Sequence, residues 1–479
     1  MKSTSTHDFL QLTPGADEPY YRQIYTRLRS AMADQLLKPG DRIPSARALA
    51  AELGLARGTV ESAYSLLAAE GYIEARGQAG TVVATGLKAI PAAVGEAPPL
   101  PASSAPAGFA PSATSPVLRP FQMGVPALDA FPRKIWARLA ARAVRATQTA
   151  DMLYPPPAGL ETLRTEIARY LQLSRGIVCS PAQVFVTAGY RDSLDLAARA
   201  LLQPGDKVWV EDPGYIPAGA LLREAGMKLV GVPVDQEGLQ VGVGVQLASR
   251  ARAAVVTPAH HSPLCVTLSL QRRVELLDWA SRHRAWIVED DYDGEYRYAS
   301  RPLPALKSLD RDDRVLYAGT FSKVLFPAIR LAYLVVPASQ TARFEETARC
   351  FSGGSPALTQ DIVAAFMAEG HFARHIQRMR RLYRERRELA AAGLDAVLGK
   401  YMLVEAQPGG MHLLLRLRGR RSDRTLAERM RADGMFGRAL SECVLESRPD
   451  LPPMLMLSFT NIESHRQAQH LARRILALL

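Results

Sequence analysis

The chain has 479 residues, 48% of them hydrophobic and 22% charged, and a formal net charge of +12. This length exceeds one ordinary core, so we expect two or more domains, and the composition is that of a globular protein. No apolar run approaches the roughly 20 residues that span a bilayer, and the amino-terminal MKSTSTHDFLQLTP has no apolar signal core, so we expect a cytoplasmic protein without a membrane partner.

The cysteines and the distribution of charge limit the function further. Four cysteines, far apart and without a CxxC pair, indicate neither zinc ligation nor a disulfide framework. The positive charge is compatible with a polyanionic partner. Its densest run, residues 374–387, predicts a helix with a solvated basic face, and a second DNA-contacting surface is the alternative.

Residues 1–84 carry a pattern of their own. Ile24 and Leu28 recur at helical spacing, Ser45 is a good N-cap for a second helix that ends at Gly54, and a third helix begins near Arg57. Two short strands around a glycine turn follow as a β-hairpin. Three helices and a hairpin, with a short turn between the second and third helices, make a winged helix-turn-helix.

The stretch PYYRQI…LKPGDRIPSARALAAELGLARGTVESAYSLLAAEGYIEARGQAGTVV resembles the GntR family of DNA-binding domains almost end to end. The resemblance implies double-stranded operator DNA as a partner. It places Arg47 at a DNA phosphate, Arg57, Gly58 and Thr59 at the major groove, and Gly77 and Gln78 at the wing tip. Ala56 stands where the family commonly has serine, and losing that cap costs the third helix about 1 kcal/mol. A helical protein-binding module is the weaker alternative.

Residues 85–118 predict an extended linker. Prolines at 91, 98, 99, 101, 106, 111 and 116 are interleaved with Ala, Ser and Gly, and aromatic residues almost vanish. Such a segment cannot bury enough apolar surface to order itself. We expect it to let the DNA-binding head take more than one position relative to the rest of the chain.

A lysine-containing stretch organises the remaining residues. The apolar run 315–318 predicts a buried strand, and Lys323 lies just beyond its carboxyl end, where ligands bind in open α/β sheets. Thr320, Ser322 and Arg330 surround it. Hydroxyls and a guanidinium suit a phosphate, and a lysine suits an imine, so the set predicts a small anionic cofactor that carries a carbonyl.

A second predicted strand, 286–288, ends in a cluster of acids and a tyrosine. Pyridoxal phosphate needs an anion against its ring nitrogen and profits from a phenol beside its ring oxygen. Asp290 and Tyr292 supply both if this strand and the strand before Lys323 lie in one sheet. Taken alone, the cluster is better explained as a solvated acidic loop.

The stretches EDDYDGEYRY, RPLPALKSLD and YAGTFSKVLFPAIRLAY resemble the fold-type I aminotransferases and, more closely, their MocR regulatory subgroup. The resemblance extends over most of residues 119–479. It implies an α/β body with a large part, about 150–340, and a small part, about 119–149 plus 345–479. It makes Lys323 the Schiff-base lysine, Asp290 the partner of the pyridine nitrogen and Tyr292 the partner of the ring oxygen, with Thr320, Ser322 and Arg330 at the phosphate.

Other positions acquire roles by the same resemblance. Tyr154 is expected to reach the cofactor phosphate of a neighbouring subunit, Gly189, Tyr190 and Arg191 to form the phosphate cup, Tyr215 to stack on the pyridine ring, and His260 to match the family histidine. His261 stands where glutamine is usual and Cys265 where glycine is usual. We expect His261 to face the effector side of the cofactor. The adjacent histidines lack a carboxylate or cysteine at ligand spacing, so we predict no metal site.

The specificity of the site is not readable from these motifs. Amino-acid aminotransferases place a carboxylate-binding arginine in the C-terminal region. Arg438 and Arg448 are both candidates, and Asn461 occupies a position where some relatives carry arginine.

Together the motifs predict a transcriptional regulator that senses pyridoxal phosphate, or an amine or amino acid that reacts with it as an external aldimine. We expect a homodimer, because the resembled fold builds its site across two subunits. The alternative is a working aminotransferase with a vestigial DNA-binding head. The complete head and the changes at Arg191, Asp192, His261 and Cys265 favour a regulator. A degenerate body that only dimerises the heads is a third interpretation.

Overall fold

The computed structural model describes residues 10–15, 18–76, 80–85, 118–298, 304–351, 354–405, 409–446 and 451–479. The chain divides into two compact units, residues 1–107 and 108–479. The predicted linker, 85–118, lies almost entirely outside the described residues, and so do Gly77, Gln78 and Arg448. No helix in the described part of the chain is long and apolar enough to cross a membrane.

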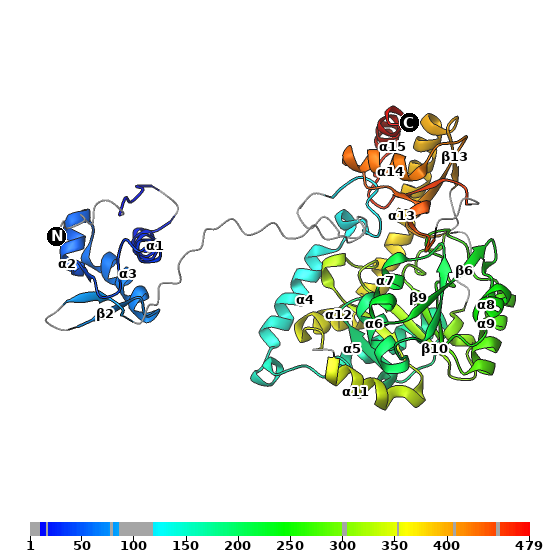
Figure 1. Cartoon of the computed structure of the whole chain (residues 1–479), viewed down its shortest axis with the longest axis horizontal. Coiled ribbons are helices and arrows are strands. Elements are labelled where there is room, and N and C mark those ends of the chain that lie inside the picture. Colours follow the sequence, from blue (N-terminus) through cyan, green and yellow to red (C-terminus); the bar gives the residue numbers. More distant parts are fainter. Residues whose placement is uncertain are drawn as a thin grey trace. The chain divides into compact units, whose positions relative to one another are not determined.

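The described part of the amino-terminal unit combines three helices with a sheet ordered β1-β3-β2 (Figure 1). Its elements are α1 (Tyr20–Ala33), β1 (Arg42–Ile43), α2 (Ala46–Leu53), α3 (Arg57–Ala69), β2 (Ile73–Ala75) and β3 (Thr81–Val83). Ile24, Leu28, Val60 and Leu67 are fully buried and pack in one apolar cluster. The helical spacing of these residues therefore forms the core, and the winged helix-turn-helix is confirmed.

The sequence sets the ends of α2 and α3. The Ser45 hydroxyl accepts a hydrogen bond from the Ala48 N–H at 3.2 Å, and Gly54 ends α2 in the left-handed region at φ +65°. Helix α3 follows Ala56, which offers no side-chain cap. The predicted loss of a cap is confirmed. The first backbone N–H groups of α3 donate no hydrogen bond to the side chain of the N-cap residue.

The body is built on a sheet whose described strands are ordered β4-β11-β10-β9-β8-β5-β6-β7. From β10 to β6 the neighbouring strands are parallel, whereas β11 and β7 run antiparallel to their neighbours. The strands are β4 (Val184–Thr187), β5 (Lys207–Asp212), β6 (Lys228–Asp235), β7 (Gly238–Leu239), β8 (Ala253–Val256), β9 (Trp286–Asp291), β10 (Val315–Thr320) and β11 (Ala332–Val335). The strands predicted before Asp290 and Lys323 are confirmed as neighbours in this sheet.

Both faces of the sheet are buried, because alternate residues of each strand pack to opposite sides. In β10, Leu316 and Ala318 join one apolar cluster and Tyr317 joins another. The first face is covered by α6 (Tyr190–Leu201), α7 (Ile216–Glu224) and α11 (Thr341–Phe351). The second is covered by α5 (Glu161–Arg175), α8 (Val241–Ala248), α9 (Leu270–His283) and α12 (Ala357–Ala368).

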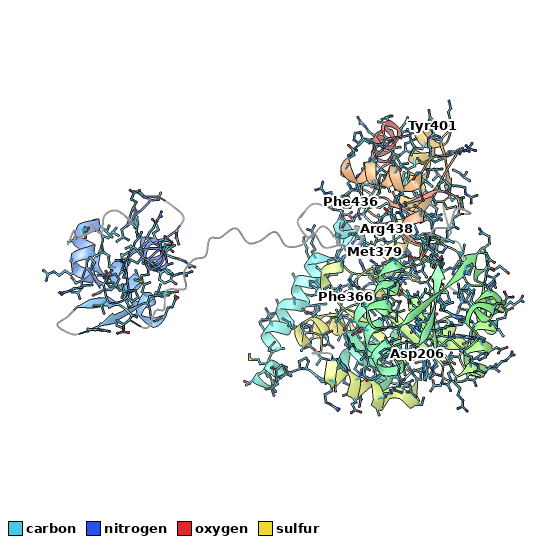
Figure 2. The ribbon with its side chains drawn as sticks, in the orientation of Figure 1. Asp206, Phe366, Met379, Tyr401, Phe436 and Arg438 are labelled. Carbon is cyan, nitrogen blue, oxygen red and sulfur yellow. The ribbon has the colours of Figure 1, made fainter. Side chains whose placement is uncertain are left out.

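A second sheet, ordered β12-β13-β15-β14, forms the C-terminal part of the body (Figure 1). Its strands are β12 (Met402–Glu405), β13 (His412–Leu417), β14 (Arg438–Ala439) and β15 (Met454–Ser458), and its helices are α13 (His371–Leu398), α14 (Asp423–Ala432) and α15 (His465–Ala477). One apolar cluster joins these elements. Arg438 marks the end of this part that faces the large sheet, and Tyr401 lies at the far end (Figure 2).

The packing divides the body differently from the predicted large and small parts. Helices α4 (Arg133–Ala146) and α12, and all but the first four residues of α11, fall in the segments assigned to the small part. In the structure, Leu139 of α4 and Val363 of α12 pack in the same apolar cluster as Tyr317 of the large sheet. An apolar stripe does not specify which neighbouring core it will join, so the sequence could not make this assignment.

The basic run 374–387 lies on α13, as predicted, and four of its seven arginines are exposed, whereas others make contacts within the body. Arg386 is buried and forms an ion pair with Asp129 at 2.6 Å. The Arg380 side chain donates to the Glu295 carbonyl at 2.5 Å. These contacts tie α13 to the segments that surround it, so the run combines an exposed basic face with a structural one.

Candidate functional site

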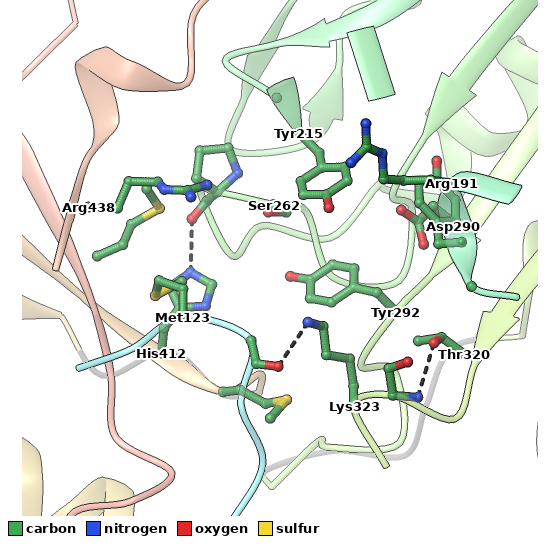
Figure 3. Close-up of a pocket in the computed structure, with 18 of the residues that line it drawn as sticks. Met123, Arg191, Tyr215, Ser262, Asp290, Tyr292, Thr320, Lys323, His412 and Arg438 are labelled. Carbon is green, nitrogen blue, oxygen red and sulfur yellow. Dashed lines mark hydrogen bonds between the residues drawn. The ribbon is translucent and has the colours of Figure 1, made fainter. Parts of the chain in front are cut away.

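One cavity of about 290 Å³ lies where the carboxyl ends of the parallel strands meet the second sheet (Figure 3). Its wall contains ten of the residues predicted to bind the cofactor: Gly189, Tyr190, Arg191, Tyr215, Asp290, Tyr292, Thr320, Ser322, Lys323 and Arg330. A parallel sheet brings the carboxyl ends of its strands to one edge, which is why residues so far apart in the sequence converge.

Three consecutive acids at the end of β9 have different environments. Glu289 accepts hydrogen bonds from two backbone N–H groups, both at 2.8 Å. Asp291 accepts from the Arg175 guanidinium and the Tyr317 hydroxyl, both at 2.6 Å. Successive strand residues point to opposite faces, so Asp290 points away from both neighbours and lines the cavity.

The buried Asp290 carboxylate is incompletely satisfied. The Tyr190 hydroxyl bonds to it, but Oδ1 has no hydrogen-bond partner. Burial raises the pKa of Asp290 well above its usual value, and the neighbouring Asp291 carboxylate adds to the effect. A buried acceptor without a donor is costly. A protonated ring nitrogen is a donor of the kind that this oxygen lacks, so the site fits pyridoxal phosphate at this point.

Lys323 enters the cavity from the loop after β10. Its Nζ donates to the Gly124 carbonyl at 2.9 Å (Figure 3). Burial lowers the pKa of Lys323, whereas the carboxylates of Asp293 and Asp290 oppose this shift. A lowered pKa increases the fraction of neutral amine, which is the form that attacks a carbonyl.

Helix α6 directs its amino-terminal end at the cavity. Gly189 is its N-cap, at φ +131°, and a Cβ at this position would lie 3.4 Å from the Arg330 guanidinium. Thr320 and Ser322 line the same cavity, and the Ser322 N–H donates to Thr320 Oγ1 at 3.1 Å. A helix amino terminus, an arginine and two hydroxyls form a site with the chemistry of a phosphate cup.

A histidine behind the wall orients Tyr292. His260 Nδ1 lies 3.0 Å from the Tyr292 hydroxyl and 3.0 Å from Asp293 Oδ1. Burial alone would lower the pKa of His260. The attraction of the Asp293 carboxylate is stronger than this effect, so the pKa of His260 lies well above its usual value. The predicted His260 therefore supports a wall residue and does not itself line the cavity.

The structure does not place His261 where the sequence predicted it. Its side chain is fully buried beside Glu211, with Nε2 3.6 Å from Oε2, and it is absent from the cavity wall. Burial lowers the pKa of His261 to about 3, and the charge of His260 acts in the same direction. His261 is therefore a neutral, buried packing residue and not the predicted effector contact. The loop directs His260 toward Tyr292 and His261 toward Glu211.

Cys265 adopts φ +59°, in the left-handed region that favours glycine, at the position where the resembled family has glycine. Its Sγ lies 3.1 Å from His412 Nε2. Burial alone would raise the pKa of Cys265. The neighbouring His412 and His260 have a larger, opposite effect and lower this pKa to about 6. His412 lines the cavity, so this pair adjoins the site.

The sequence motifs missed most of the wall that faces the second sheet. These residues are Met123, Gly124, Ser262, Pro263, Met411, His412, Cys443 and Met456. Met123 and Gly124 had no signal beyond their position at the start of the body. Arg438, a candidate for the carboxylate-binding arginine, lines the cavity. Asn461, at the position where some relatives carry arginine, is not in the cavity wall, and its amide donates to the carbonyls of Val125 and Pro126.

Tyr154 lies outside the cavity of its own chain. Its exposed fraction is 97%, which is unusual for a tyrosine and leaves the ring available to another molecule. The predicted role of Tyr154 in a neighbouring subunit stays a prediction.

The predicted DNA contacts that the structure describes lie on helices α2 and α3. Arg47 on α2 and Arg57 and Gly58 at the start of α3 are exposed, and Thr59 is partly exposed. Arg57 Nε lies 2.7 Å from a Glu61 carboxylate oxygen. This arrangement is that of a helix-turn-helix, whose recognition helix contacts base edges with its amino-terminal residues.

Two family models match the chain. The description "Aminotransferase class I and II" matches residues 124–460, and "Bacterial regulatory proteins, gntR family" matches residues 20–83. The first covers more than half of the chain and contains the whole cavity wall apart from Met123. The second contains the helix-turn-helix.

Whole-chain relatives carry the same pair of domains. The chain is 38% identical over 449 residues to the probable rhizopine catabolism regulatory protein MocR of Rhizobium meliloti, covering 92% of this chain and 90% of that protein. It is 34% identical to the HTH-type transcriptional regulator TauR of Rhodobacter capsulatus, covering 89% and 90%. It is also 34% identical to the HTH-type pyridoxine biosynthesis transcriptional regulator PdxR of Corynebacterium glutamicum, covering 85% of each.

The body has the fold of solved aminotransferases. An archaeal alanine:glyoxylate aminotransferase superposes with a TM-score of 0.69 at 24% identity, over 76% of this chain and 91% of that one. LysN, the α-aminoadipate aminotransferase of Thermus thermophilus, superposes with a TM-score of 0.66 at 27% identity, over 75% and 93%. The chain therefore belongs to the aminotransferase class I and II family and, with its gntR-type head, to the MocR group of helix-turn-helix regulators.

Proposed function

We propose that this protein is a transcriptional regulator whose body binds pyridoxal 5′-phosphate and whose DNA binding changes when a small amine reacts at that site. One observation carries the proposal. A buried carboxylate with an unsatisfied oxygen, Asp290, and a half-buried amine, Lys323, share a cavity with the amino-terminal end of α6. These groups match the ring nitrogen, the aldehyde and the phosphate of one small molecule.

When bound, pyridoxal phosphate supplies an aldehyde that bonds reversibly to amines and a ring that withdraws electrons. Asp290 would accept a hydrogen bond from the protonated ring nitrogen, and this positive partner would favour the ionised carboxylate that burial disfavours. Tyr292 would donate to the ring oxygen, and Tyr215 would pack against the ring. The residues that would hold the phosphate are Gly189, Tyr190, Arg191, Thr320, Ser322 and Arg330.

Lys323 connects this site to the chain that leads to the head. Lys323 would hold the cofactor through its amine. In the structure the same amine donates to the Gly124 carbonyl, so whether Lys323 is engaged by the cofactor or free of it would decide whether this contact forms. Most of the predicted linker lies in the undescribed stretch that ends at residue 117. Gly124 follows seven positions later in the sequence. Coupling requires the effector to bind one arrangement of the chain more tightly than the other.

We further propose a homodimer in which the exposed Tyr154 reaches the site of the partner subunit. Two heads would then bind a pair of operator half-sites, with Arg57, Gly58 and Thr59 at base edges and Arg47 at a phosphate. Gly77 and Gln78 would contact DNA from the wing.

A working aminotransferase is the second candidate. It is favoured by the retained Lys323, Asp290 and Tyr292, which share the cavity as the chemistry of transamination requires. Multiple turnovers with an amino donor and a keto acid would select this candidate.

The decisive experiment measures binding of the full-length protein to DNA from upstream of its own gene. We expect sequence-specific, salt-sensitive binding that shifts with pyridoxal phosphate in the wild type and does not shift in Lys323→Ala. Lys400→Ala, which changes an exposed lysine of the same body, is the control and should behave as the wild type.

The covalent step has a separate readout. Borohydride reduction followed by mass spectrometry should locate the cofactor on Lys323 in the wild type. Regulation by the cofactor that is unchanged in Lys323→Ala would contradict the proposed mechanism, and absence of specific DNA binding under all conditions would select the aminotransferase.

A further inference from the structure

A cluster of titratable side chains lies where the loop between β8 and α9 meets the second sheet. Cys265 and His260 belong to this loop, and His412 is the first residue of β13. Cys265 Sγ lies 3.1 Å from His412 Nε2, and the ring centroids of His260 and His412 are 6.0 Å apart. His412 lines the cavity (Figure 3). The proposed cofactor contacts use neither this thiol nor His412.

The surroundings of the thiol favour an ion pair. Burial alone would lower the pKa of His412, but the charge of Cys265 has a larger effect and raises it. Burial would likewise raise the pKa of Cys265, and His412 and His260 outweigh it. Tyr292, which follows β9, faces the same thiol. Cys265 and His412 therefore favour the thiolate and imidazolium forms, in which the sulfur is nucleophilic and a proton lies beside it.

His260 contributes a nitrogen without a partner. Its Nδ1 is engaged by Asp293 at 3.0 Å, whereas its Nε2 is buried and has no hydrogen-bond partner. A Cβ on Gly410 would collide with the His260 ring, so the second sheet closes tightly over it. A buried polar nitrogen without a partner is costly. An oxygen atom added to the neighbouring sulfur is a partner of the kind that this nitrogen lacks.

The ligand chemistry of the cluster is limited by its composition and by access. Among the described residues, no group of three or more His, Cys, Asp or Glu side chains is arranged to hold a metal ion. Cys265 is only 4% exposed, but its partner His412 lines the cavity of about 290 Å³. The sulfur is therefore reached from the cavity by a small polar reagent and is shielded from a bulky one.

We propose that Cys265 is a site of oxidation by small hydroperoxides, with His412 as the proton donor. The inference goes beyond the proposed function and depends on neither pyridoxal phosphate nor DNA. The thiolate sulfur attacks one peroxide oxygen, so that an S–O bond forms as the O–O bond breaks. The sulfur is oxidised to a sulfenic acid, and the peroxide is reduced. With hydrogen peroxide, the leaving oxygen takes the proton of His412 and departs as water.

Oxidation would change the wall of the cavity. The sulfenic acid replaces the anion that raises the pKa of His412, so this wall residue would lose its reason to be charged. Cys443 lines the cavity and belongs to the same apolar cluster as Cys265. A sulfenic acid and a thiol condense to a disulfide and release a second water, so the product at Cys265 is either of these two forms.

The first test maps oxidation in the full-length protein treated with hydrogen peroxide. A denaturing quench with dimedone, followed by mass spectrometry, detects a sulfenic acid or a disulfide at each cysteine. At pH 6 an ordinary thiol is almost fully protonated, so Cys265 should react about 10-fold faster than the exposed Cys350. This advantage should narrow as the pH rises and ordinary thiols ionise. Either product at Cys265 supports the proposal, and oxidation of Cys265 no faster than that of Cys350 at pH 6 would overturn it.

Substitution assigns the reaction to the pair. Cys265→Gly supplies the residue that the resembled family has at this left-handed position, so the variant should fold and lose the modification. His412→Asn removes the imidazolium and should slow oxidation of Cys265 about 3- to 10-fold at pH 6. His470→Asn changes an exposed histidine of α15 and should react as the wild type. An unchanged rate in His412→Asn would refute the role of His412, and the wild-type comparison with Cys350 stands even if that variant does not fold.

Discussion

Asp290 and its two acidic neighbours are similar in chemistry and differ in environment. Glu289 and Asp291 are saturated by hydrogen bonds, and Asp290 alone keeps an oxygen without a donor. The difference arises from the alternation of side chains along β9. At the scale of the residue, the same alternation determines which acid stabilises the fold and which is available to a ligand.

Cys265 permits a prediction at this scale. Because His412 and His260 lower its pKa to about 6, Cys265 should be mostly thiolate at neutral pH. The stabilisation that this charge contributes is fully present above the pKa of the unfolded thiol and is lost as the pH falls through about 6. A pH titration of thiolate absorbance in the ultraviolet should show a step near this value.

Substitution identifies the source of that step. It should be missing in Cys265→Ala and retained in Cys179→Ala, because burial raises the pKa of Cys179. A step that survives in Cys265→Ala would refute the assignment. In the structure, the left-handed backbone of Cys265 is accompanied by its contact with His412, an interaction that glycine could not make.

At the scale of the elements, the site depends on how β9 is held. Arg175 ends α5 and is buried between two carboxylates, at 2.6 Å from Asp291 and 3.1 Å from Glu295. This contact joins a helix on one face of the sheet to the strand end that presents Asp290. The helix thereby fixes the position of a cavity residue that it does not touch.

Removing this contact should destabilise the body. Arg175→Met leaves buried carboxylates without their cation and should lower the free energy of unfolding by about 3–5 kcal/mol. All four tryptophans lie between residues 136 and 286, so denaturant unfolding followed by tryptophan fluorescence reports on the body and not on the head. Arg169→Met, which removes an exposed arginine of the same helix, should change stability by less than about 1 kcal/mol. Equal effects of the two substitutions would contradict this account.

At the scale of the whole molecule, the chain joins a small gntR-type head to a larger aminotransferase-like body, and the proposed function assigns DNA binding to the head and its regulation to the body. The formal net charge of +12 favours association with a polyanion, but the described contacts of α13 show that part of this charge is used inside the body. We expect the phosphate contacts to come mainly from the head, which carries the helix-turn-helix. Each such contact releases counterions, which makes its contribution measurable through salt dependence.

Arg47→Ala tests this assignment. Loss of a phosphate contact should weaken binding to specific and nonspecific DNA alike and reduce the slope of log affinity against log salt by about 1 per head. Arg27→Ala changes an exposed arginine of α1 and should keep the wild-type slope. A changed sequence preference with an unchanged slope would instead place Arg47 at a base edge.

The sequence alone determined the elements and half of the site. Apolar runs marked strands β9 and β10, and Ser45 and Gly54 bounded α2. The acidic cluster lay at the end of β9, and Lys323 lay beyond the end of the neighbouring β10. These features are local, because each depends on the direction of the chain and on the preferences of a few adjacent residues.

Only the tertiary structure decided the other half. The second sheet supplied Met411, Arg438 and Met456, His261 turned into the core, and α4 and α12 joined the large sheet. None of these outcomes is encoded in a local pattern. Each depends on which surfaces meet when two sheets pack together, and that is set by the register and burial of residues far apart in the chain.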